Sequence, residues 1–144
     1  MWADTLLDLE RGHLIRLLIW GILSTVSGTL LLAWLAWRRG AAELLRHFGI
    51  QTAAWGVVIA AVALWGWRAL ELRDFAGLQR LVNILWLNVG LGAGYAAVGA
   101  TLALMGWNLG RRAGFVGAGL GILVQGLALM LLDLRLVAAI GPLR

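Results

Sequence analysis

Cysteine is absent from this sequence of 144 residues, proline occurs once, and charged residues make up only 13%. The lack of cysteine excludes disulfides, thiolate metal sites and cysteine nucleophiles. The low charge argues against an ordinary soluble domain, in which about a quarter of the residues are charged. All 12 basic residues are arginine. Because these arginines flank apolar runs, we expect lipid headgroups and not nucleic acid as their partner.

Apolar residues are in excess, at 62% of the chain. A small soluble core cannot hide so many, because a chain of this size exposes much of its surface even when folded. Four runs approach or exceed the length of about 20 apolar residues that a membrane-spanning helix needs: residues 17–37, 48–67, 81–107 and 113–132. Backbone polar groups in lipid must be satisfied within the segment. We therefore expect an all-α integral membrane four-helix bundle, with residues 1–144 forming one domain.

Tryptophan and short connections organise these runs. Trp34 and Trp37 end the first run, and Trp65 and Trp67 end the second, as is typical of residues at a membrane interface. The fourth run has no tryptophan and many glycines, which predicts the helix least exposed to lipid. The short connections predict two consecutive helical hairpins with both termini on one side. Arginine counts do not decide which side that is, and residues 5–16 suggest a separate interfacial helix.

Small residues recur at steps of three and four along the last two runs, which places them on helix faces. Such faces let backbones approach closely in lipid. The predicted helix-packing residues are Asn88, Gly92, Gly99, Gly106, Gly114, Gly117, Gly121 and Gln125. A hydrogen bond across the bundle is the expected use of Gln125. A second stripe of Gly90, Gly94, Ala97 and Thr101 predicts a further partner for the third helix.

A few polar residues have two interpretations. Asn88, Tyr95 and Gln125 are either polar contacts between packed helices, which we favour, or a polar site at the membrane midplane. Asp133 is the only acid close to the interior of an apolar run. We expect it to be solvated at a helix end beside Arg135, in preference to a role as a proton relay.

Recognisable catalytic and cofactor patterns are missing. His13 and His47 stand at opposite ends of the first run, too far apart to share one haem or metal. No carboxylate cluster, no glycine-rich phosphate loop after a strand and no serine–histidine–acid spacing is present. The sequence therefore predicts no catalytic residue, no metal and no cofactor. The four runs also contain no Asp, Glu, Lys, Arg or His, which argues against charge movement through the bundle.

Two segments echo one another weakly. Residues 70–73 read Leu-Glu-Leu-Arg and residues 132–135 read Leu-Asp-Leu-Arg. The echo indicates either a duplicated hairpin or, as we prefer, two helix ends that leave the membrane in the same way.

Two stretches resemble a known family: residues 47–56 (His-Phe-Gly-Ile-Gln-Thr-Ala-Ala-Trp-Gly), and residues 88–95 (Asn-Val-Gly-Leu-Gly-Ala-Gly-Tyr) together with Val-Gln-Gly at 124–126 and Leu-Asp at 132–133. They are similar to small bacterial four-helix membrane proteins that carry a domain of unknown function. The resemblance covers roughly residues 10 to 140. It implies a four-helix fold and the bacterial inner membrane, and no activity. An acid often stands in that family where this chain has Gly92.

The sequence favours a non-enzymatic, multi-pass protein of the bacterial inner membrane. We expect it to act by helix packing, as a homo-oligomer or as an accessory subunit of a larger membrane complex. Its partners would be the lipid bilayer and either itself or another membrane protein. Two alternatives remain open: a small transporter or channel subunit for a neutral solute, and an accessory subunit that binds a pigment or quinone.

Overall fold

The computed structural model describes residues 2–38 and 42–143, which form four long helices and one short 3-10 turn. The helices are α1 (Trp2–Arg38), α2 (Glu43–Arg68), α3 (Phe75–Asn108) and α4 (Ala113–Ile140), followed by η1 (Gly141–Leu143). The part of the chain that the structure describes contains no strand, so the all-α prediction is confirmed. Each of the four helices is long and apolar enough to cross a membrane.

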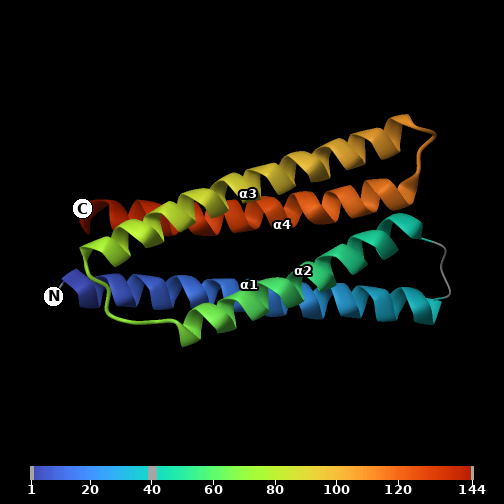
Figure 1. The fold of residues 1–144 in the computed structure, drawn as a ribbon. Helices are drawn as coiled ribbons and strands as arrows, with labels where there is room; N and C mark the ends of the chain where they lie inside the picture. Colours follow the sequence, from blue (N-terminus) through green and yellow to red (C-terminus); the bar gives the residue numbers. More distant parts are fainter. Residues whose placement is uncertain (1, 39–41, 144) are drawn as a thin grey trace.

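The helices form two antiparallel hairpins, α1 with α2 and α3 with α4 (Figure 1). The hairpins meet mainly through α4, which packs against α2 and, less extensively, against α1. Of the four apolar helix segments, that of α4 has the largest buried share, at 33%. The fourth helix, which the sequence predicts to be the least exposed to lipid, is thus the most enclosed of the four. Figure 1 also shows both chain ends at the end of the bundle where α2 connects to α3.

The expectation of a separate interfacial helix over residues 5–16 is wrong, because these residues belong to α1. The helix runs without a break from Trp2 to Arg38. Leu6, Glu10, His13 and Leu17 are all buried in it, and their spacing of three and four residues continues one helix face into the apolar run. Leu6 packs with Leu78, Val82, Leu85, Leu136 and Ile140 in a cluster at the end of the bundle that carries both termini.

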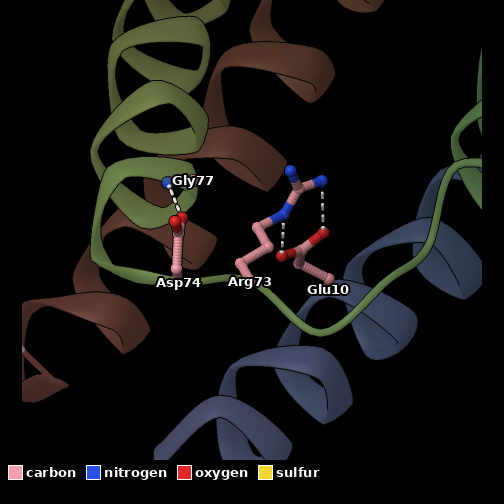
Figure 2. Close-up of polar contacts among 4 residues, drawn as sticks. All are labelled: Glu10, Arg73, Asp74 and Gly77. Carbon is pink, nitrogen blue, oxygen red and sulfur yellow. Dashed lines mark hydrogen bonds and ion pairs between the residues drawn. The ribbon is translucent and has the colours of Figure 1, made fainter.

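α3 also begins earlier than its apolar run, at Phe75. The carboxylate of Asp74 accepts a hydrogen bond of 2.7 Å from the backbone N–H of Gly77 (Figure 2). This contact caps the helix by satisfying one of the N–H groups that the first turn leaves without a partner. The cap fixes where the preceding connection ends, and that connection carries Arg73.

Glycine allows the two helices of each hairpin to touch backbone to backbone. A Cβ atom added at Gly21 would lie 2.8 Å from the carbonyl oxygen of Gly56, and one at Gly56 would lie 2.7 Å from that of Gly21. The second hairpin repeats this arrangement. A Cβ atom added at Gly99 would lie 2.6 Å from the carbonyl oxygen of Gly119, and one added at Gly119 would lie 2.5 Å from that of Gly99. Real Cβ atoms do not approach oxygens so closely, so these positions require glycine.

We expect Gly99→Leu to weaken the bundle strongly and Ala93→Leu to leave it nearly unchanged. Both residues are in α3, but Ala93 is exposed, whereas a Cβ at Gly99 would clash with the backbone of α4. Forcing extra atoms into a packed contact typically costs about 1–3 kcal/mol, and separating two backbones costs at least that. Thermal unfolding in mild detergent measures the difference. Equal unfolding temperatures for the two variants would contradict the assigned contact.

Candidate functional site

A cleft of about 340 Å³ lies between the two hairpins, with residues of all four helices in its walls. α1 and α4 contribute Leu17 and Leu129, and α2 and α3 contribute Ile59 and Leu85, so most of the lining is apolar. Trp55 of α2 and Tyr95 of α3 line it near the middle of their helices, with ring centroids 5.0 Å apart and the planes at 62°. A cleft of this size and character is typical of a small-molecule site.

Glu10 and Arg73 form an ion pair at the opposite end of the cleft (Figure 2). The guanidinium donates through Nε to Oε1 at 2.7 Å and through Nη2 to Oε2 at 3.1 Å, so both carboxylate oxygens are engaged. The hydrogen bonds to Glu10 raise the pKa of Arg73 above its usual value. Because Glu10 is buried in α1, the pair fixes the α2–α3 connection to the first helix.

His13 of α1 and Asp133 of α4 form a second pair at the same end. His13 Nε2 lies 3.1 Å from Asp133 Oδ1, and each side chain is only 7% exposed. Both residues line the cleft. The expectation that Asp133 is solvated is therefore wrong. α4 continues past it to Ile140 and α1 begins well before His13, so the two helices cover the carboxylate. Arg135 lies exposed on the helix surface.

The predicted midplane residues are divided between two places. Asn88 and Tyr95 line the cleft. Gln125 is 1% exposed and lies against α1, where its Oε1 accepts a hydrogen bond of 2.8 Å from Trp20 Nε1. Its Nε2 donates to Ser24 Oγ at 3.2 Å. Gln125 thus makes the expected hydrogen bond across the bundle, and the structure does not bring it together with Asn88 and Tyr95.

The other predicted packing residues lie on two different helix contacts. Gly92, Gly99 and Gly106 of α3 face α4. Gly114, Gly117 and Gly121 of α4 instead face α2, where added Cβ atoms would meet His47, Leu44 and Gln51. α4 meets α3 through Gly119 and Gly126. Because α4 has two glycine faces nearly half a turn apart, at 3.6 residues per turn, it can pack closely against two helices at once.

Glu10, His13 and Arg73 are the functional candidates that reasoning from the sequence missed. They lie outside the four apolar runs, where charged residues are expected to be hydrated. The sequence does contain a signal that Glu10 and His13 are buried, because they share one helical face with the apolar Leu6 and Leu17. Within residues 2–38 and 42–143, no group of three or more His, Cys, Asp or Glu side chains gathers as a metal site would require.

We expect Arg73→Leu to destabilise the protein more than Glu10→Leu does. Loss of Arg73 leaves a buried carboxylate without a partner, which typically costs about 3–5 kcal/mol. Loss of Glu10 costs less, because the Arg73 side chain is 22% exposed and can turn to water. The double variant Glu10→Leu/Arg73→Leu should recover part of the loss.

Thermal unfolding of the three variants measures these differences, with the exposed Arg80→Leu as the control. If Arg73→Leu unfolds like the Arg80→Leu control, the pair does not hold the connection in place.

Comparison with curated proteins and with solved structures finds no match. A family model matches residues 16–134, which include Arg73 and Asp133 and leave Glu10 and His13 just before the matched segment. This match confirms the resemblance to a domain of unknown function. The chain belongs to the family of unknown function DUF6992.

Proposed function

We propose that this protein is a non-enzymatic, multi-pass protein of the bacterial cytoplasmic membrane that holds a lipid-soluble molecule in the cleft between its hairpins. Large apolar side chains on the outside of all four helices support membrane insertion. Leu30 is 64% exposed on α1, Val57 56% on α2, Val98 58% on α3 and Leu131 61% on α4. Lipid is the solvent in which such a surface is stable.

The proposed topology has four spans with both termini on one side. Reporter fusions at the N-terminus, Ala42, Glu71, Gly110 and the C-terminus should therefore alternate in location. The sequence supports no choice of side, so the fusions also decide the orientation. Two neighbouring fusion positions on the same side of the membrane would contradict the four-span topology.

The observation that carries the binding role is the composition of the cleft. Its walls are apolar along most of its length, and its charged and polar side chains gather mainly at one end. From Leu81 to Tyr95 the cleft follows α3 for about 20 Å, at 1.5 Å per residue. An elongated molecule with an apolar body and one polar end matches this arrangement. Such molecules reach a membrane protein from the bilayer, between helices.

A role in association is a second proposal, supported by a different surface. Added Cβ atoms at Gly90 and Gly94 of α3 would meet nothing within 4 Å, so this stripe is open. Close approach of another helix is the direct use of an open small-residue face in lipid. We propose that the protein packs there against itself or against a subunit of a larger membrane complex.

Transport of a neutral solute is less well supported. The polar lining of the cleft ends near Asn88 and Tyr95. Towards the other end of the bundle, α4 packs closely against α2 between the hairpins, where Cβ atoms added at Gly117 and Gly121 would clash with the Leu44 backbone and the Gln51 side chain. A continuous polar path would have to pass these contacts, and the described residues offer none.

We expect the purified protein to carry a bound small molecule that Val62→Trp displaces. Val62 lines the cleft and is more than half exposed, so an indole there fills the cleft without crowding the buried contacts. Mild-detergent purification from the native host, followed by mass spectrometry of the intact particle, detects both bound lipids and bound proteins. Trp substitution at the exposed Val98 of α3, which does not line the cleft, is the matched control.

If the unaltered protein and Val62→Trp carry the same molecules in the same amounts, the cleft is not the binding site. A particle whose mass shows one chain and no partner under all mild conditions would contradict the association role.

A further inference from the structure

The charged end of the cleft holds two atoms that the protein itself leaves free. Glu10 and Arg73 engage each other through both carboxylate oxygens. The contact between His13 and Asp133 uses only Nε2 and Oδ1. Among the described residues, no fully buried side-chain nitrogen or oxygen lacks a hydrogen-bond partner. His13 Nδ1 and Asp133 Oδ2 therefore retain access to open space, and the open space that both residues line is the cleft.

These two atoms favour a group that donates a hydrogen bond. With a neutral imidazole whose Nε2 proton faces Asp133, both Nδ1 and Oδ2 are acceptors. With an imidazolium, Nδ1 becomes a donor beside the acceptor Oδ2. A hydroxyl group can satisfy either state, because it donates one hydrogen bond and accepts others.

The charges at this end disfavour an anionic headgroup. Among the described residues that line the cleft, only Arg73 has a permanent positive charge, and Glu10 already neutralises it. The carboxylate of Asp133 would repel a phosphate or carboxylate, and the apolar walls nearby would not solvate one. The site is therefore suited to a neutral polar group.

We propose that the cleft binds a neutral lipid with a hydroxyl headgroup, either a lipid-soluble quinol or a long-chain isoprenoid alcohol. The hydroxyl lies between His13 and Asp133, and the apolar body follows α3 towards Trp55 and Tyr95. This assignment rests on the proposed binding role of the cleft. It adds the chemistry of the headgroup and the two residues that recognise it.

The experiment compares each hydroxyl lipid with its own methyl ether, which cannot donate a hydrogen bond. The probes are a decyl-substituted benzoquinol kept reduced and its dimethyl ether, farnesol and its methyl ether, and phosphatidylglycerol as an anionic lipid. Binding is measured as partition between phosphatidylcholine nanodiscs that contain the protein and empty ones. We expect at least one hydroxyl probe to bind about tenfold more tightly than its ether, as loss of a hydrogen bond to a charged group predicts. The probe that shows this difference identifies the class of lipid.

Variants assign the difference to the two residues. Asp133→Leu and His13→Leu should abolish the preference for hydroxyl over ether, while Asp133→Asn, which keeps an acceptor oxygen, should retain part of it. Trp20→Phe is the control, because it removes a buried hydrogen bond to Gln125 outside the cleft and should leave the preference unchanged. If the leucine variants fail to fold, the comparison of hydroxyl and ether binding in the unaltered protein still tests the headgroup assignment.

The outcomes separate this inference from the binding role itself. If hydroxyl and ether bind equally and Val62→Trp abolishes both, the cleft binds lipid but the headgroup assignment is wrong. Preference for phosphatidylglycerol over both hydroxyl probes also overturns the assignment. If Val62→Trp binds every probe as the unaltered protein does, the cleft is not the site and both proposals fail.

Discussion

Backbone contact between helices is the constraint on which the rest of this structure depends. Each hairpin has two glycines on each helix, seven residues apart: Gly21 and Gly28 opposite Gly49 and Gly56, and Gly92 and Gly99 opposite Gly119 and Gly126. Seven residues are close to two helical turns, so each pair lies on one face. Contacts of this kind stabilise helix pairs in lipid, where the hydrophobic effect offers no drive for association.

The shared pattern of glycines also supports a duplicated hairpin. The similarity between residues 70–73 and 132–135 does not support a duplication, because Glu71 lies in the connection after α2 and Asp133 lies inside α4.

The cleft follows from these close contacts. α1 and α3 are each held to their hairpin partner, and α4 is the helix that joins the two hairpins. α2 and α3 meet through the rings of Trp55 and Tyr95, and the space beside them stays open. The duplicated pattern of glycines thus gives two similar hairpins, while the polar side chains make them different. His13 belongs to the first hairpin and Asp133 to the second, so this ionic contact forms only when the hairpins assemble.

The sequence predicted the helices well because apolar run length and interfacial tryptophans are local signals. From spacing alone it predicted the glycine face of α3 and one of the two glycine faces of α4, and it missed the face of Gly119 and Gly126. It could not predict which neighbour each face meets, since Gly117 and Gly119 are two residues apart and contact α2 and α3 respectively. The charged end of the cleft was missed for a related reason. Asp133 and His13 each look like residues at a hydrated helix end, and only the long-range pairing of α1 with α4 buries them together. The placement of Gln125 against Trp20 and Ser24 likewise depends on contacts more than a hundred residues apart in sequence.

The position of the ionic contacts along the helices limits what the site can do. Asp133 is about 10 Å from the last residue of α4 and His13 about 17 Å from the first residue of α1, at 1.5 Å per residue. Both therefore lie towards the end of the bundle that carries the termini. In the proposed membrane topology this is near the level where a bilayer changes from headgroups to hydrocarbon. Burial of charge costs less there than at the midplane, because water and headgroups are close. A lipid-soluble molecule has its polar group at this same depth and its apolar body deeper. With the proposed lipid in the cleft, the ionic residues would thus meet its headgroup, and the apolar, aromatic part of the cleft would enclose its tail.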